Sequence, residues 1–214
     1  MKLSKFNEIG RSMVEMLGVL AIIGVLSVGA IAGYSKAMMK YKLNKHAESY
    51  RLLLYETMNM SKQIDPSKLT ENLDLLPLLE KTNSIPSGYS NMIKYDNYYI
   101  YDIFGNATWV GIVAGGRGYI GTDFTPSAEG YEICRNLVNV AIENSEHIYY
   151  LHTDKKTLED GEPSYSDLAG YYGDTVCTTQ SWMKCLKNIT LEDTKAICNN
   201  CDSVSCRLYI NFVN

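Results

Sequence analysis

The chain begins with an apolar segment that is long enough to form a membrane-crossing helix. Between Met13 and Tyr34 the sequence reads MVEMLGVLAIIGVLSVGAIAGY, and Glu15 is the only charged residue in it. At a rise of about 1.5 Å per residue, a helix of this length crosses a hydrocarbon layer of about 30 Å. A carboxylate in such a helix costs about 2.5–3.5 kcal/mol on insertion scales, so we interpret Glu15 as a functional residue.

Beyond Tyr34 the pattern changes to that of an amphipathic helix. Residues 35–63 contain no Pro and no Gly, and residues with high helix propensity dominate. Helical spacing aligns one stripe that we expect to pack beneath a sheet, namely Tyr50, Leu53, Leu54, Thr57, Met58 and Ser61. We expect four charged residues to stay exposed: Lys42, Lys45, Glu48 and Arg51. Asp65-Pro66 is predicted to end the helix.

The remainder of the chain shows mainly strand patterns separated by short helices. Strands are predicted at residues 97–104, 107–113, 119–124, 147–152 and 207–213, with a two-residue turn at Gly105-Asn106. Short helices are predicted within residues 70–81, after Thr125-Pro126, and from a capping box at Thr190 and Asp193 up to Asn199. Residues 153–176 are polar and turn-rich, which predicts an exposed loop. The predicted fold class is therefore α+β.

Charge is distributed unevenly along the chain. Residues 1–45 carry seven Lys and Arg against two acidic residues, whereas residues 46–214 carry thirteen against twenty-two. The body is therefore acidic, although the formal net charge of the whole chain is only −4. An acidic body argues against nucleic-acid binding, which depends on neutralising phosphate charge.

Six cysteines lie in the second half of the sequence, at Cys134, Cys177, Cys185, Cys198, Cys201 and Cys206. An even number of cysteines behind an export signal favours disulfides in an oxidising compartment. Six cysteines allow fifteen pairings, and the sequence does not choose among them. The alternative is a zinc site built from Cys198, Cys201 and Cys206 with Cys185, which the same context disfavours.

The sequence contains no constellation that we interpret as catalytic. His46, His147 and His152 are not accompanied by a nucleophile motif, and we expect all three at the surface. Residues 116–121 match G-x-G-x-x-G, but no helix is predicted to start inside the motif, so a glycine-rich turn is favoured over a dinucleotide site. We therefore expect neither an enzyme nor a cofactor.

Residues 10–17, G-RSMVEML, resemble the type III signal of type IV pilins and type II secretion pseudopilins. In that family a membrane peptidase cuts after the Gly, the new N-terminal amine is methylated, and a Glu at the fifth mature position is nearly always present. The resemblance therefore implies cleavage after Gly10, methylation of Arg11 and an assembly role for Glu15. An amine at Arg11 could pair with Glu15 of a neighbouring subunit inside an apolar bundle, where a paired charge is far better stabilised than a lone one.

The resemblance also implies an architecture, which is a pilin fold with a long N-terminal helix packed on an antiparallel sheet. It implies a cleaved leader (1–10), a transmembrane and polymerisation half of the helix (11–35), an amphipathic half (36–64) and a globular head (65–214). Within the head, the segment FTPSAEGYEICRNLV at residues 124–138 resembles type IVb-like pilins in layout. In the family, a Cys-bridged C-terminal region commonly shapes the exposed surface.

The resemblance further implies partners and a location. The partners would be other copies of the chain, other pilins, a prepilin peptidase, and an inner-membrane assembly platform with a cytoplasmic ATPase. Before assembly the protein would sit in the inner membrane of a Gram-negative bacterium with its head in the periplasm. After assembly it would lie in a pilus at the cell surface or in a periplasmic filament.

Two alternatives to a pilus subunit are considered. The first is a type II secretion pseudopilin, which shares the same signal. The second is a secreted or anchored binding or enzymatic domain with an ordinary signal peptide, cut after Ala30-Ile31-Ala32. Glu15 and the uninterrupted helical pattern beyond Tyr34 argue against this second alternative.

Overall fold

The computed structural model describes residues 6–94, 98–125, 127–159, 162–177, 183–199, 201 and 206–212. Side chains are described within these ranges except at residues 6–12 and 155–169. The chain divides into two compact units, Met1–Lys42 and Leu43–Asn214, which are treated separately below. The predicted α+β class is confirmed, because a long N-terminal apolar helix, an antiparallel sheet and disulfides near the C-terminus are all present.

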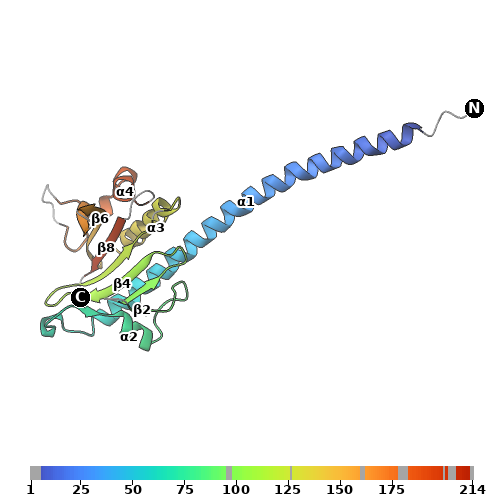
Figure 1. The fold of residues 1–214 in the computed structure, drawn as a ribbon. Coiled ribbons are helices and arrows are strands. Elements are labelled where there is room, and N and C mark those ends of the chain that lie inside the picture. Colours follow the sequence, from blue (N-terminus) through green and yellow to red (C-terminus); the bar gives the residue numbers. More distant parts are fainter. Residues whose placement is uncertain are drawn as a thin grey trace, which may run out of the picture. The chain divides into compact units, whose positions relative to one another are not determined.

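The first unit consists of the N-terminal part of helix α1 (Phe6–Ser61), shown in blue in Figure 1. This part is α-helical without interruption up to Lys42. The four glycines at positions 18, 24, 29 and 33 lie within the helix, although each lowers helix propensity by about 1 kcal/mol relative to Ala. Among the described residues, α1 is the one helix long and apolar enough to cross a membrane by length and composition.

The last part of α1 belongs to the second unit, the head, and supplies one wall of its core. The predicted stripe from Tyr50 to Ser61 is buried at every position, and the four predicted charged residues are exposed. The helix ends at Ser61, four residues before Asp65, and its last turn is closed by side-chain hydroxyls. Thr57 Oγ1 donates to the Leu53 carbonyl oxygen (2.7 Å), and Ser61 Oγ donates to that of Met58 (2.9 Å).

Within the described residues, eight strands form one antiparallel sheet. They are β1 (Leu73–Asp74), β2 (Ile93–Lys94), β3 (Tyr98–Tyr101), β4 (Ala107–Ile112), β5 (Gly118–Asp123), β6 (Ile148–Glu159), β7 (Glu162–Tyr172) and β8 (Cys206–Phe212). Their order is β2-β3-β4-β5-β8-β6-β7, and β1 pairs with β4. The predicted last strand therefore lies inside the sheet, between β5 and β6, and its residues alternate strictly between buried and half-buried.

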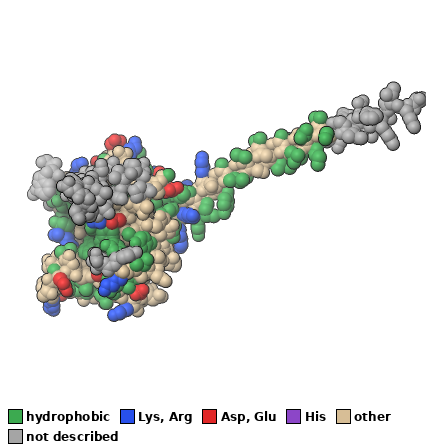
Figure 2. All heavy atoms as spheres, viewed as in Figure 1, with side chains coloured by type: hydrophobic (Ala, Val, Ile, Leu, Met, Phe, Trp, Pro, Cys, Tyr) green, Lys and Arg blue, Asp and Glu red, His purple; other side chains and the backbone are tan. Residues whose placement is uncertain are grey.

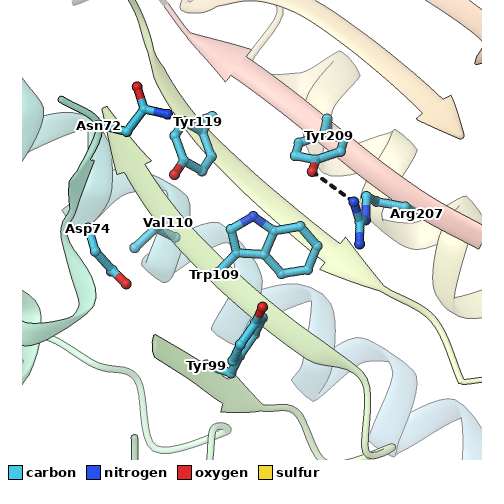
Figure 3. A pocket seen from close by; sticks show the side chains of 8 residues that line it. All are labelled: Asn72, Asp74, Tyr99, Trp109, Val110, Tyr119, Arg207 and Tyr209. Atoms are coloured by element: carbon cyan, nitrogen blue, oxygen red, sulfur yellow. Dashed lines mark hydrogen bonds between the residues drawn. The ribbon is translucent and has the colours of Figure 1, made fainter. Parts of the chain in front are cut away.

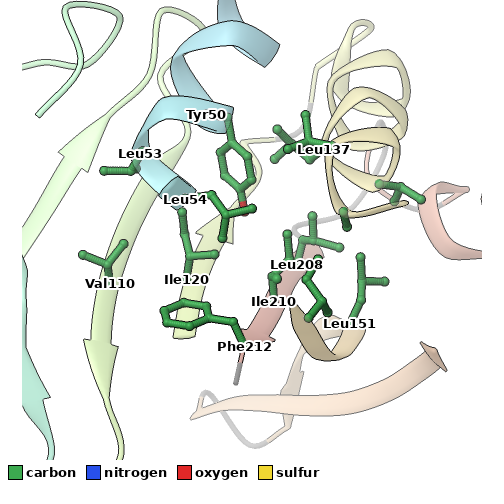
Figure 4. Packing of buried hydrophobic residues seen from close by; sticks show 14 of the residues in the cluster. Tyr50, Leu53, Leu54, Val110, Ile120, Leu137, Leu151, Leu208, Ile210 and Phe212 are labelled. Carbon is green, nitrogen blue, oxygen red and sulfur yellow. The ribbon is translucent and has the colours of Figure 1, made fainter. Parts of the chain in front are cut away.

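Helices cover the inner face of this sheet. They are α2 (Leu76–Lys81), α3 (Gly130–Glu143) and α4 (Leu191–Cys198), with 3-10 turns η1 (Pro66–Lys68) and η2 (Leu186–Asn188). Figure 4 shows the core, in which side chains from α1, α3 and the sheet meet: Tyr50, Leu54, Leu137, Ile120, Ile210 and Phe212. The predicted capping box is confirmed, because Thr190 and Asp193 each accept a hydrogen bond from the other's backbone N–H.

The turn between β3 and β4 differs from the prediction. Tyr101 pairs with Ala107, so five residues form the loop instead of the two predicted at Gly105-Asn106. Asp102 determines this geometry, because its Oδ1 accepts hydrogen bonds from the backbone N–H groups of Phe104 (2.8 Å) and Asn106 (2.9 Å). Gly105 supplies the positive φ of 81° that the loop needs.

Two further predictions were wrong. The polar segment 153–176 is mostly strand, because β6 and β7 pair from Tyr150–Tyr172 out to Glu159–Glu162. Helix α3 begins at Gly130, five residues beyond Thr125, which was predicted to cap it. Thr125 instead joins the β3–β4 loop: its N–H donates to Asn106 Oδ1 (2.9 Å) and its Oγ1 donates to the Gly105 carbonyl oxygen (3.2 Å). Pro126 lies outside the described residues.

Candidate functional site

The apolar N-terminal part of α1 exposes its described side chains around the whole helix. From Met13 to Ile31, the large apolar side chains each expose between 53% and 75% of their surface. Figure 2 shows these side chains along the helix. A helix that is apolar on all sides requires a nonpolar environment, such as lipid or other helices. Burying a large aliphatic side chain fully contributes about 1.5–3 kcal/mol, so covering this helix is worth on the order of 20 kcal/mol.

Glu15 interrupts this apolar surface near its start. It is exposed, as are its neighbours Val14 and Met16. The four glycines of the segment also face open space, because a Cβ added at any of them would contact nothing within 4 Å outside the helix. Gly29 and Gly33 have the small-xxx-small spacing that permits another helix to approach closely. The segment thus offers one carboxylate and small-residue positions to whatever covers it.

The two other predicted N-terminal site residues lie in the backbone of α1. Gly10 and Arg11 are inside the helical range Phe6–Ser61. Their side chains are outside the described residues, and the pairing of the Arg11 amine with Glu15 of a neighbouring subunit stays a prediction. Glu15 lies five residues after Gly10, and the resemblance to a type III signal depends on this spacing.

A buried contact between His46 and Asp102 joins the C-terminal part of α1 to the β3–β4 loop. His46, which was expected at the surface, is only 2% exposed, and its Nε2 lies 2.8 Å from Asp102 Oδ2. The rings of Phe104 and His46 pack in a T-shaped arrangement, with centroids 5.5 Å apart. Burial raises the pKa of Asp102, but the hydrogen bond and charge of His46 and the hydrogen bonds from Asn106 outweigh it, so the net pKa is lowered.

Three disulfides hold the C-terminal part of the head. Cys134–Cys198 joins α3 to α4, Cys177–Cys185 closes the loop after β7, and Cys201–Cys206 joins the segment that follows α4 to the start of β8. The predicted disulfides are thereby confirmed, and the fold selects one of the fifteen pairings. Each bridge typically contributes about 2–4 kcal/mol, which suits a head exposed to proteases.

We expect all six cysteines to be oxidised in the exported protein. Alkylation of the denatured, unreduced chain should label no thiol, and reduction should release six, as mass spectrometry would show directly. A stoichiometric zinc content, with thiols freed by a chelator, would contradict this pairing.

The outer face of the sheet carries an aromatic cleft that the sequence analysis did not find. Two adjoining hollows, of about 340 and 260 Å³, share Asn72, Trp109, Tyr119 and Tyr209. Burial raises the pKa of the Tyr119 and Tyr209 hydroxyl groups, so both remain protonated hydrogen-bond donors over the physiological range. The strands β4, β5 and β8 each contribute one aromatic residue to the cleft, and these residues meet only once the strand register is known.

Comparisons with family models, with curated proteins and with solved structures return no match. The function of this chain is therefore inferred from its own residues and their arrangement.

Proposed function

We propose that the protein is a structural subunit of a type IV pilus or a related filament, stored in the membrane and polymerised through α1. One observation carries the proposal: an apolar helix exposed on all sides holds a single carboxylate five residues beyond Gly10. Lipid can cover the helix in the stored subunit, and neighbouring copies of the same helix can cover it in a filament. The apolar surface therefore suits both the stored subunit and the filament. The two states differ in whether the Glu15 carboxylate has a charged partner from a neighbouring subunit.

The proposed role of Glu15 is to set the register between subunits. Cleavage after Gly10 would create a positive amine at Arg11, and polymerisation would bring it to Glu15 of a neighbour. Opposite charges in a low-dielectric bundle attract strongly, whereas an unpaired carboxylate there is costly. A subunit inserted one turn out of register would leave both charges unpaired, so the pair favours one stacking.

The head supports the choice of a pilus subunit over a type II secretion pseudopilin. It carries three disulfides and an eight-stranded sheet within the described residues. A large, covalently braced head suits a filament exposed outside the cell. Leu52 and Tyr55 of α1 are more than half exposed, which supplies apolar contact area for a neighbouring head.

The first test is the position of the mature N-terminus. We expect chains isolated from membranes to begin at Arg11 with a methylated amine, as Edman degradation and intact mass would show. Gly10→Val should leave residues 1–10 attached, because a branched side chain at the cut obstructs the peptidase, whereas Ile9→Val is a matched control that should be processed normally. A mature chain that begins at Gly33 would refute the pilin proposal and support an ordinary signal peptide.

A further inference from the structure

The cleft on the outer sheet face is built around Trp109 of β4. The indole lies over Gly121 of the neighbouring strand β5, because a Cβ at Gly121 would come within 2.5 Å of indole atoms Cε2 and Cζ2. Only a residue without a side chain lets the ring lie flat against the sheet. The indole therefore packs on backbone on the Gly121 side, and Trp109 lines both hollows.

Two tyrosines form walls on either side of the indole. Tyr99 of β3 and Tyr209 of β8 stand at 73° and 82° to the indole, with ring centroids 5.8 and 5.7 Å away. Figure 3 shows the indole between these two rings, with the Tyr99 hydroxyl pointing toward it. The result is a concave aromatic slot whose shape is set by three strands.

Polar groups in fixed orientations line one end of the slot. Asp74 accepts hydrogen bonds from the backbone N–H groups of Leu76 (2.9 Å) and Tyr98 (3.2 Å), which hold its carboxylate in place. Asn72 Oδ1 accepts from the Ala114 backbone N–H (3.1 Å), which orients the amide. The Tyr119 hydroxyl lies over Gly111, where a Cβ would be only 2.6 Å from it.

The charge at the other end of the slot is already neutralised. Arg207 forms a two-point ion pair with Asp123, through Nε–Oδ1 (2.6 Å) and Nη2–Oδ2 (3.0 Å). Its Nη1 donates to the Tyr209 hydroxyl (3.2 Å), and its guanidinium lies 4.9 Å from the centroid of the Trp109 ring. An anionic ligand would have to compete with Asp123 for this cation and would also meet Asp74. The slot therefore disfavours an anionic ligand.

We propose that this cleft binds a neutral oligosaccharide, with one pyranose ring stacked on Trp109 between Tyr99 and Tyr209. A pyranose has a face of C–H groups, which the electron-rich face of an aromatic ring attracts. Its edge carries hydroxyls, which match the Asp74 carboxylate, the Asn72 amide and the tyrosine hydroxyls. The hollows fall near the lower end of the roughly 300–1,000 Å³ usual for small-ligand sites. Their continuation toward Asn211 provides room for more than one ring.

The concavity favours a sugar over a protein partner. A stable protein interface buries about 800 Å² on each side, and its partner surfaces are complementary over that area. Here the distinctive feature is a small hollow between Tyr99 and Tyr209 with polar groups in fixed orientations, which suits a small ring better. The proposal does not depend on filament assembly, so it can be tested on the unassembled chain.

The test uses the full chain in micelles of lauryldimethylamine oxide, a detergent without a sugar headgroup. We expect neutral oligosaccharides on a glycan array to retain the chain. Retention by acidic oligosaccharides that disappears at high salt is not expected. The affinity for the best neutral glycan is then measured by tryptophan fluorescence in a Trp182→Phe background, which leaves Trp109 as the sole tryptophan.

Variants of the slot separate stacking from general adhesion, with calorimetry used where the fluorophore is lost. Trp109→Ala should weaken binding at least 10-fold and Trp109→Phe by a smaller factor. Gly121→Ala, which tilts the indole, should weaken binding several-fold while every cleft side chain remains. Leu191→Ala, which removes an exposed apolar side chain on α4, should leave binding unchanged.

Three results would overturn the proposal. One is that no neutral glycan is retained by the folded wild-type chain. Another is that Trp109→Phe and Gly121→Ala bind like the wild type with unchanged circular dichroism. The third is that wild type binds no glycan while these same variants lose filaments, which would make the face a contact between subunits.

Discussion

Replacing Glu15 with leucine should stop filament formation while leaving the subunit inserted and processed. Insertion should be unimpaired, because the change removes a charge that costs about 2.5–3.5 kcal/mol in a membrane helix. In the proposed filament, however, the Arg11 amine of the incoming subunit would enter an apolar bundle without a partner. Breaking one half of a buried pair costs about 3–5 kcal/mol, which lowers the equilibrium constant for subunit addition by about 10²–10⁴.

The measurement compares sheared filament yield with the amount of processed subunit in membranes. Glu15→Asp should give an intermediate yield, because the charge remains but its reach is one methylene shorter. Met16→Leu, an apolar change at the neighbouring exposed position, should assemble normally. If Glu15→Leu assembled normally at a normal processed level, the carboxylate would not set the register, and the Arg11 side chain would become the residue to examine.

Elements with a strong burial pattern were predictable from the sequence. The stripe from Tyr50 to Ser61 and the alternation in β8 both follow from which face meets the core. The β6–β7 hairpin was not predictable in this way. The outer part of the hairpin is held by backbone pairing that runs to Glu159–Glu162, and β7 lies at the edge of the sheet. The hairpin sequence therefore lacks the alternation of apolar and polar residues that marks a strand.

The two candidate sites differ in how far the sequence could reveal them. The Gly10, Arg11 and Glu15 motif is local, so its spacing is visible in the sequence. The aromatic cleft depends on register: Trp109 lies opposite Gly121, and Gly121 lies opposite Tyr209, a residue one hundred positions from Trp109. His46 was placed at the surface for the same reason, because its partner Asp102 is recognisable only once α1 packs on the β3–β4 loop.

Asp102→Ala should destabilise the head by about 3–5 kcal/mol. The change leaves the buried His46 ring without its carboxylate partner, and it removes the acceptor of the loop N–H groups of Phe104 and Asn106. For a domain of this size, about 1 kcal/mol shifts Tm by about 2–4 °C, so the expected loss is about 6–20 °C. Near-ultraviolet circular dichroism of the full chain in micelles, with its disulfides intact, would record the transition.

The effect should also depend on pH with a definite sign. Because the pKa of Asp102 is lowered in the folded state, its stabilisation is fully present above its unfolded pKa of about 3.9 and is lost as pH falls toward the folded pKa. The difference in Tm between wild type and Asp102→Asn should therefore shrink below about pH 4. The matched control is Glu143→Ala, which breaks the half-exposed pair between Arg51 of α1 and Glu143 of α3 and should cost at most about 1 kcal/mol. Equal losses for the two alanine variants, or a difference that does not change with pH, would mean that burial of the His46–Asp102 pair does not hold α1 to the β3–β4 loop.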